Sequence, residues 1–327
     1  MGVTIIGTGK ALPKLIVKNE DLKKLVETED QWIKDRTGIA ARHVATDESG
    51  LDLAVIAAKQ SLKDLDKDTI GLVIVATCSP DMLVPSMGAM VKKELGLDNA
   101  IAFDVNAACS GFIYGTWIAE ALMKNSNNGT SIKINRTLLI GVERLSRITN
   151  WQDRGTCILF GDGAGSAVLE HSDNAPGILG VYIRNFDDLT DSLTCGMDYI
   201  KTPFSEEGEK NMFLKMNGTQ VFKFAVNAVA EVMEKVLEQT GLNPDEIKFY
   251  VPHQANMRII NAAAQKMKQP LEKFSINIQD TGNVSAASIP MALSDLMASG
   301  KVEPGDKIMM VGFGGGLSAG AIIYEAV

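Results

Sequence analysis

The sequence feature that most constrains the fold is an internal repeat. A glycine-rich turn followed by an apolar strand occurs twice, in FGDGAGSAVLE (160–170) and in FGGGLSAGAIIYE (313–325). An acidic turn followed by a strand also occurs twice, in DKDTIGLVIVAT (66–77) and in NPDEIKFYVPHQ (243–254), and each copy follows an amphipathic helical pattern. Because the order is the same in both halves, the repeat predicts two related α/β units packed face to face as a pseudo-symmetric pair.

Strand and helix patterns alternate along the whole chain, which is typical of an α/β fold with mixed or parallel sheets. We expect residues 1–170 to form one half and residues 171–327 the other. The polar, turn-rich segment KNSNNGTSIKIN (124–135) is expected to be an exposed loop. The clearest strands are predicted at 3–9, 70–78, 101–108, 137–143 and 166–170, and helices at 51–65, 85–95 and 222–239.

Charge and composition exclude several classes of protein. The net charge is −8, which disfavours non-specific binding to nucleic acid, since such binding depends on neutralising phosphates. No uncharged apolar run reaches about 18 residues, so no transmembrane helix is expected. The N-terminal segment does not have the pattern of a signal peptide. Cysteines stand singly at 78, 109, 157 and 195, which fits the reducing cytoplasm and indicates neither a disulfide framework nor a zinc site.

Cys109 is the first candidate for chemistry. It lies in NAACSGF, after a predicted strand and at the start of a predicted helix, where the helix dipole favours a thiolate. Its small neighbours leave room for a substrate. A buried, inert cysteine that fills a gap has the same surroundings, so these residues leave nucleophile and filler both open. The other three cysteines lack this combination and are interpreted as structural.

His253 and Asn283 are the next candidates. His253 follows the strand FYV, and the carboxyl end of a strand in an α/β protein faces the ligand crevice. The alternative is a histidine with a purely structural hydrogen bond. Asn283 precedes small residues that lead into a helix, much as NAACSGF does, although an ordinary turn asparagine has the same pattern. His43 and His171 lie in charged stretches and are expected to be solvated.

The turn GFGGGLSAG (312–320) lacks the lysine and serine of a phosphate-binding P-loop. Its glycines fit better with a close approach of the backbone, with an N–H directed at a developing oxyanion. A cysteine, a histidine, an asparagine and this turn together indicate acyl transfer.

The chain resembles β-ketoacyl-acyl-carrier-protein synthase III, a condensing enzyme of the thiolase superfamily, over essentially its whole length. The resemblance rests on segments that occur in the order of the family: DQWIKDRTGI (30–39), DVNAACSGF (104–112), DRGTCILFGDGAG (153–165), MNGTQVFKFAV (216–226), PHQANMRI (252–259), GNVSAASIP (282–290) and GFGGG (312–316). It implies a thiolase-like fold with layers in the order α-β-α-β-α.

The resemblance also assigns roles by position. Cys109 is expected to be the acylated nucleophile, His253 and Asn283 to bind the malonyl thioester carbonyl, and the N–H groups of Cys109 and Gly315 to form the oxyanion hole. The positions expected to bind coenzyme A are Thr28, Trp32, Arg36, Arg154, Gly218, Phe222, Ala255, Asn256 and Arg258. Those expected to contact the acidic carrier protein are Lys223, Arg258 and Lys266.

The activity implied is a two-step exchange. Acyl-CoA loads the cysteine, and malonyl-acyl-carrier-protein then loses CO₂ and condenses with the acyl group, without a metal or redox cofactor. The resemblance further implies a homodimer, in which Val84 reaches the acyl pocket of the partner subunit. Two alternatives remain: a specialised relative that only transfers acyl groups in a secondary pathway, and a non-catalytic scaffold, against which the presence of all three polar residues argues. Ser318 and Ala319 depart from the Thr-Trp pair common in the family, which leaves the shape of the acyl pocket open.

Overall fold

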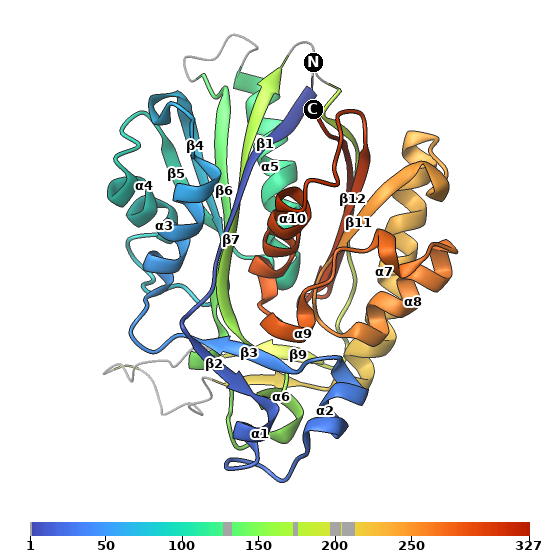
Figure 1. The fold of residues 1–327 in the computed structure, drawn as a ribbon. Coiled ribbons are helices and arrows are strands. Elements are labelled where there is room, and N and C mark those ends of the chain that lie inside the picture. Colours follow the sequence, from blue (N-terminus) through green and yellow to red (C-terminus); the bar gives the residue numbers. More distant parts are fainter. Residues whose placement is uncertain (1, 127–132, 173–175, 197–203, 205–212) are drawn as a thin grey trace.

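The fold is organised around two sheets that face each other across a pair of helices (Figure 1). The structure is a computed structural model that describes residues 2–126, 133–172, 176–196, 204 and 213–327. The five-stranded sheet has the order β1-β7-β6-β4-β5 and the four-stranded sheet the order β11-β12-β13-β8. Their strands are β1 (Gly2–Ala11), β4 (Ile70–Ala76), β5 (Ile101–Val105), β6 (Arg136–Arg144), β7 (Asp162–Ser172), β8 (Ile178–Asn185), β11 (Ile247–Pro252), β12 (Lys307–Gly314) and β13 (Ser318–Glu325).

The two sheets share one layout, as the sequence repeat predicts. In the first, β4 is parallel to β6, which is antiparallel to β7, which is antiparallel to β1. In the second, β11 is parallel to β12, which is antiparallel to β13, which is antiparallel to β8. The place of β5 is taken in the second sheet by an isolated parallel bridge between Tyr250 and Phe274. The two large sheets therefore differ mainly at this edge.

Helices form three layers around the sheets, as Figure 1 shows. Helices α3 (Gly50–Ser61) and α4 (Met87–Leu95) cover the outer face of the five-stranded sheet, and α7 (Gly218–Thr240) and α8 (Met257–Met267) cover that of the four-stranded sheet. Helices α5 (Gly111–Ser126) and α10 (Ser288–Ala298) lie between the sheets and contact strands of both. This confirms the expected α-β-α-β-α arrangement.

The central helices are apolar on several sides because both sheets pack on them. Helix α10 buries Ile289, Met291 and Leu293, and α5 buries Phe112 and Ile113. A helix with one covered face needs only one apolar stripe, whereas a helix buried between two sheets needs apolar residues around most of its circumference. The apolar run after Cys109 thus reflects its central position.

Shorter elements gather at one end of the sheets, at the bottom of Figure 1. The antiparallel pairs β2–β3 and β9–β10 form two small sheets there, and apolar side chains that include Leu22, Ile33 and Leu145 make a separate core. The elements are β2 (Leu15–Lys18), β3 (Ala41–Val44), β9 (Leu193–Cys195), β10 (Leu214–Met216), α1 (Asn19–Leu22), α2 (Asp30–Thr37), α6 (Arg154–Cys157) and α9 (Ile278–Thr281). They enclose the region where β5 and β11 end.

Most predicted elements are present, with shifted ends. Helix α3 ends at Ser61 rather than 65, and α4 begins at Met87 because the Ser86 hydroxyl accepts the N–H of Ala89 and so caps it. The loop predicted at 124–135 starts later, since α5 continues to Ser126, and residues 127–132 lie outside the described part. Within the described residues, no helix combines the length and apolarity needed to cross a membrane.

Candidate active site

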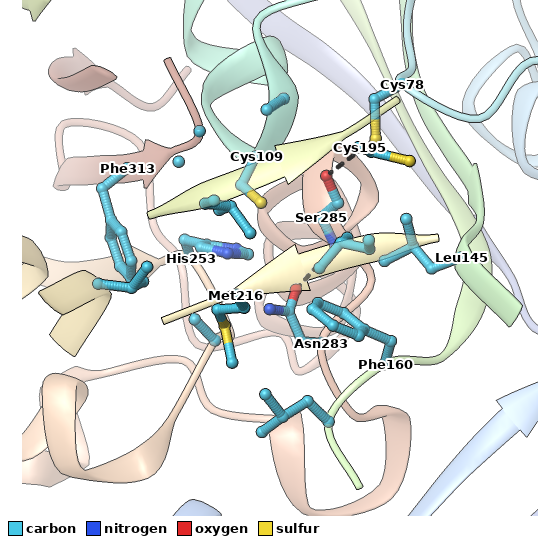
Figure 2. Close-up of a pocket in the computed structure, with 18 of the residues that line it drawn as sticks. Cys78, Cys109, Leu145, Phe160, Cys195, Met216, His253, Asn283, Ser285 and Phe313 are labelled. Atoms are coloured by element: carbon cyan, nitrogen blue, oxygen red, sulfur yellow. Dashed lines mark hydrogen bonds between the residues drawn. The ribbon is translucent and has the colours of Figure 1, made fainter. Parts of the chain in front are cut away.

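A large pocket, with a volume of about 1440 Å³, lies between the two halves of the fold and the small elements below them. Cys109, His253 and Asn283 all line it (Figure 2). Cys109 comes from the turn before α5, His253 from the turn after β11, and Asn283 from the turn between α9 and α10. The three candidates singled out in the sequence are thus brought together from both halves.

Cys109 is held by a strained turn at the start of the central helix. After β5, the Asn106 side-chain oxygen accepts the N–H of Ala108 at 3.2 Å, and Ala108 has a left-handed φ of 45°. A 3-10 turn, Ala108–Ser110, then carries Cys109 into α5. Left-handed φ values are costly for residues other than glycine and persist only where the surroundings enforce them. The turn therefore fixes the nucleophile candidate at the helix N-terminus.

The second half contains the same turn. The Asn283 side-chain oxygen accepts the N–H of Ser285 at 2.9 Å, Ser285 has a φ of 45°, and a 3-10 turn, Ser285–Ala287, leads into α10. By position, Ala286 is the counterpart of Cys109 and Asn283 the counterpart of Asn106. The likeness between NAACSGF and GNVSAASIP in the sequence thus reflects a repeated backbone structure with different side chains.

Burial raises the pKa of the Cys109 thiol to about 12, the Ser285 hydroxyl acts in the opposite direction, and the Glu143 carboxylate raises the pKa further. Loss of solvation therefore opposes the helix dipole, which favours the thiolate. The thiol must lose its proton when it attacks.

His253 is a neutral imidazole with unused hydrogen-bonding capacity. It is 1% exposed, its backbone N–H donates to the Val311 carbonyl, and its ring meets the Phe313 ring edge-on with centroids 5.2 Å apart. Burial lowers its pKa to about 3. Within the described residues, neither ring nitrogen has a hydrogen-bond partner. A buried polar atom without a partner is costly, so this ring is prepared for a ligand that accepts an N–H.

Asn283 is oriented by its own turn. Since its side-chain oxygen already accepts the Ser285 N–H, its amide nitrogen is the group that remains to donate. Its backbone is fixed on both sides, because its N–H donates to Leu159 and its carbonyl accepts the N–H of Gly161. The segment DRGTCILFGDGAG therefore supports the asparagine. His253 and Asn283 together can donate two hydrogen bonds to one carbonyl oxygen.

The glycine turn after β12 lies directly against the nucleophile candidate. A Cβ atom on Gly314 would lie 2.8 Å from the backbone nitrogen of Cys109, so only glycine fits there without displacement. The Ser318 hydroxyl contacts the Ser110 hydroxyl at 3.0 Å and donates to the Gly315 carbonyl at 3.4 Å, which ties this turn to the start of α5. Gly315 lines the pocket. The turn that carries Gly315 therefore lies next to Cys109 in the pocket wall.

Most positions expected to bind coenzyme A lie on the pocket wall. Trp32 is flanked by two guanidinium groups, with the Arg154 carbon 4.0 Å and the Arg36 carbon 5.1 Å from the ring centroid. Arg154 itself does not line the pocket, and neither does Thr28, whose hydroxyl is buried without a partner in the described part of the chain. The expected positions that do line it are Trp32, Arg36, Gly218, Phe222, Ala255, Asn256 and Arg258.

The three cations expected to contact a carrier protein are exposed. Lys223 lies on α7 next to the pocket residue Phe222, Arg258 lies in the first turn of α8 and lines the pocket, and Lys266 lies near the end of α8. Lys266 forms an ion pair with Glu234 at 2.9 Å, which reduces its availability.

Sequence reasoning missed part of the site. Cys78 and Cys195 were interpreted as structural, but both line the pocket, whereas Cys157 is buried outside it. Cys78 follows β4, so its place at the carboxyl end of a strand was a signal in the sequence. Behind it lies Glu143, which is fully buried on β6. In the described part of the chain, no group of three or more histidine, cysteine or carboxylate side chains is arranged to hold a metal ion.

The family models that match the chain describe one family. Models of 3-oxoacyl-[acyl-carrier-protein] synthase III match residues 103–185, and models of its C-terminal part match residues 237–326. A β-ketoacyl-[acyl-carrier-protein] synthase III from Clostridium beijerinckii is 43% identical over 326 residues, which cover 99% of each chain.

Solved structures agree with this. The 3-oxoacyl-[acyl-carrier-protein] synthase III of Aquifex aeolicus superposes with a TM-score of 0.91 at 41% identity, over 99% of this chain and 100% of that one. The priming β-ketosynthase of the R1128 polyketide pathway superposes with a TM-score of 0.90 at 32% identity, over 99% and 96% of the two chains.

Proposed function

The chain belongs to the β-ketoacyl-[acyl-carrier-protein] synthase III family, the condensing enzymes that initiate fatty acid synthesis, and we propose that Cys109, His253 and Asn283 are its catalytic residues. The observation that carries this proposal is their convergence on one pocket, with a protonated thiol on one side and two unused donors on the other. A nucleophile and an enolate-stabilising pair in one site are what a decarboxylative condensation requires.

In the first half-reaction, Cys109 attacks the thioester carbonyl of an acyl-CoA. The negative charge that develops on the carbonyl oxygen is stabilised by the N–H groups of Cys109 and Gly315. Coenzyme A then leaves as the thiol, and the acyl group remains on Cys109. The contact between Gly314 and the Cys109 backbone supports this geometry, because it places the glycine turn next to the reacting sulfur.

In the second half-reaction, malonyl-acyl-carrier-protein enters the same pocket. His253 and Asn283 donate hydrogen bonds to its thioester carbonyl, so loss of CO₂ leaves an enolate whose charge is already solvated by the protein. The enolate carbon attacks the acyl carbon, the bond from that carbon to the Cys109 sulfur breaks, and Cys109 leaves as a thiolate that takes up a proton. The β-ketoacyl-acyl-carrier-protein then leaves the pocket. The low pKa of His253 supports this role, since a neutral imidazole donates one N–H without releasing its proton to the enolate.

Coenzyme A binding is proposed at the mouth of the pocket. Trp32 offers an aromatic face for the adenine, and Arg36, Arg154 and Arg258 offer donors that match phosphate geometry. Since the Arg154 guanidinium lies 4.0 Å from the Trp32 centroid, it must move away before a base can stack on the same face. Thr28, Gly218, Phe222, Ala255 and Asn256 complete the proposed coenzyme A site.

Carrier-protein docking is proposed on Lys223, Arg258 and Lys266. An acidic partner needs a local positive surface on a chain whose net charge is −8. All three cations are exposed, and Arg258 also lines the pocket. We further propose that the fold divides into halves at residues 1–170 and 171–327, since the five-stranded sheet ends at Ser172 and the four-stranded sheet begins at Ile178.

A homodimer is proposed from an exposed apolar segment. Met82, Leu83 and Val84 have side chains 54%, 73% and 85% exposed, and Met82 and Leu83 also line the pocket. Contiguous exposed apolar residues commonly mark an interface. The cytoplasm is the proposed compartment, because the thiols at the pocket require reducing conditions.

The test is turnover with a panel of acetyl-, isobutyryl- and hexanoyl-CoA together with malonyl-acyl-carrier-protein. The proposal predicts release of CO₂ and formation of β-ketoacyl-acyl-carrier-protein, identified by intact-protein mass spectrometry. Because the chain is also similar to a priming β-ketosynthase of a polyketide pathway, the carrier proteins of both pathways are compared. Acylation of the enzyme without decarboxylation of malonyl groups would favour an acyltransferase instead.

A further inference from the structure

A pair of buried hydroxyls joins the turn of the nucleophile to the glycine turn, and the mechanism above does not use it. Ser110 follows Cys109 directly and is 0% exposed, and Ser318 begins β13 and is 2% exposed. The Ser318 hydroxyl donates to the Ser110 hydroxyl at 3.0 Å, and the Ser110 hydroxyl donates to the backbone carbonyl of Ser318 at 3.3 Å. Each serine therefore donates to the other and accepts from it, and both are shielded from bulk water.

This serine pair connects the two halves of the fold. Its members lie 208 residues apart, Ser110 in the first half and Ser318 in the second. In the part of the chain that the structure describes, the hydrogen bonds between residues 108–111 and residues 314–318 are those of these two hydroxyls. The Ser318 proton can also be directed to the Gly315 carbonyl, at 3.4 Å. The pair therefore contacts the residue whose N–H is proposed for the oxyanion hole.

The position of Gly315 depends on how the ends of its loop are held. In the register of β12 and β13, Gly314 pairs with Ser318, so Gly315, Gly316 and Leu317 form the connection between the strands. Glycines restrict the backbone little, because they have no Cβ. Ser318 is the first residue after this connection, and its hydroxyl fixes that end of the loop against the start of α5.

The repeated turn in the second half shows that a serine is not needed to form the turn itself. Residues Ser285–Ala287 adopt the same 3-10 turn as Ala108–Ser110, and Ala287 stands at the position of Ser110. Ala287 is also 0% exposed. Because the turn forms there with a methyl group in place of the hydroxyl, the Ser110 hydroxyl serves the contact with the glycine turn.

We propose that Ser110 and Ser318 are positioning residues for acyl transfer, and that they hold the N–H groups of Cys109 and Gly315 at the spacing that one oxyanion requires. The proposal rests on the function proposed above. The two N–H groups belong to different halves of the fold, and a displacement of about 1 Å at a reacting centre can lower the rate about 100-fold. Ser110 does not line the pocket, so its hydroxyl acts through the glycine turn.

The experiment measures single-turnover acylation of Cys109 by rapid quench and mass spectrometry, with an acyl-CoA from the panel that loads the wild type. Ser110→Ala and Ser318→Ala should each lower the maximal rate about tenfold, which is part of the effect of losing an oxyanion donor. The acyl-CoA concentration that gives half the maximal rate should stay within about twofold, because coenzyme A is bound by other residues. The double variant should also lose only about tenfold, since each change breaks the same contact.

Two comparisons separate positioning from a general loss of packing. Ser318→Thr and Ser318→Val introduce side chains of the same shape, but only Ser318→Thr keeps a hydroxyl, so it should acylate about tenfold faster than Ser318→Val. Thr116→Val removes another buried hydroxyl from α5, one that donates to the Phe112 carbonyl, and it should acylate at the wild-type rate. Ser110→Ala tests the proposal even if a variant at Ser318 does not fold, because the repeated turn accepts alanine at this position.

The proposal is overturned if Ser110→Ala acylates at the wild-type rate, or if Ser318→Thr is as slow as Ser318→Val. It is also overturned if the double variant loses about 100-fold, the product of two independent effects. A wild type that never carries an acyl group on Cys109 would instead refute the proposed function, and this proposal with it. An acylated wild type with variants that match its rate would refute the role of the serine pair alone.

Discussion

The buried imidazole of His253 predicts a specific loss of stability in acid. Its pKa is about 3 in the folded protein and about 6.5 in an unfolded chain. The unfolded state therefore binds a proton that the folded state does not bind between these two values, and the free energy of unfolding falls as the pH decreases through 6.5 towards 3. At pH 5, which is 1.5 units below the unfolded pKa, the loss is about 2 kcal/mol at 1.36 kcal/mol per unit.

Replacing the imidazole removes this pH-dependent contribution to the free energy of unfolding. His253→Gln should lower the free energy of unfolding by an amount that does not change with pH, because the glutamine packs differently. Between pH 7.5 and pH 5, the difference in unfolding free energy between wild type and variant should shift by about 2 kcal/mol in favour of the variant. All other titrating groups are common to both proteins and cancel in the difference. Urea titrations at pH 7.5, 6 and 5, with equal protein concentrations, measure it. A difference that stays constant with pH would show that His253 is not held neutral by burial, and the role of a neutral donor would fail with it.

Three further variants test the other parts of the site. Asn283→Ala removes one hydrogen-bond donor to the enolate. In single-turnover assays, the rate of condensation from preloaded acyl-enzyme should fall about 10²- to 10³-fold, while the rate of acylation stays within about threefold. Equal losses in both rates would contradict the assigned role. Gly314→Ala places a Cβ 2.8 Å from the Cys109 nitrogen, so acylation should fall at least about tenfold, and an unchanged rate would mean that this turn does not form the oxyanion site. Trp32→Ala should raise KM for acyl-CoA about tenfold, the equivalent of about 1.4 kcal/mol of binding free energy. The rate of condensation from preloaded enzyme should change little. A KM equal to that of wild type would mean that the adenine does not stack on Trp32.

The fold could be predicted from the sequence largely because it is repeated. The two glycine-rich turns with their strands became β7 and β13, and the two acidic turns became the entries to β4 and β11. The reduced fifth strand of the second sheet was not predictable, because a single bridge at Tyr250 leaves no periodic pattern. Helix ends were also misplaced, since capping by Ser86 and contacts of the last turns decide them locally.

Local patterns singled out three residues that the fold places in one pocket: Cys109 follows a strand and begins a run of small residues, His253 follows a strand, and Asn283 precedes small residues that lead into a helix. The sequence did not indicate the side chains that lie behind the pocket wall. Glu143 stands at the end of a predicted strand with nothing to distinguish it, and its partner Cys78 lies 65 residues earlier in the chain. The protonation state of Cys109 also depends on burial by the second half, which no local pattern of NAACSGF contains.

We propose that one pocket acylates Cys109 and then uses His253 and Asn283 to condense that acyl group with a malonyl unit. Peptide-mapped mass spectrometry of the enzyme, first with acyl-CoA and then with malonyl-acyl-carrier-protein, follows both steps on the same residue. We expect a mass gain equal to the acyl group on the peptide that contains Cys109, and its disappearance as β-ketoacyl-acyl-carrier-protein forms. An acyl group on another residue, or one that remains on Cys109 after malonyl-acyl-carrier-protein is added, would contradict it.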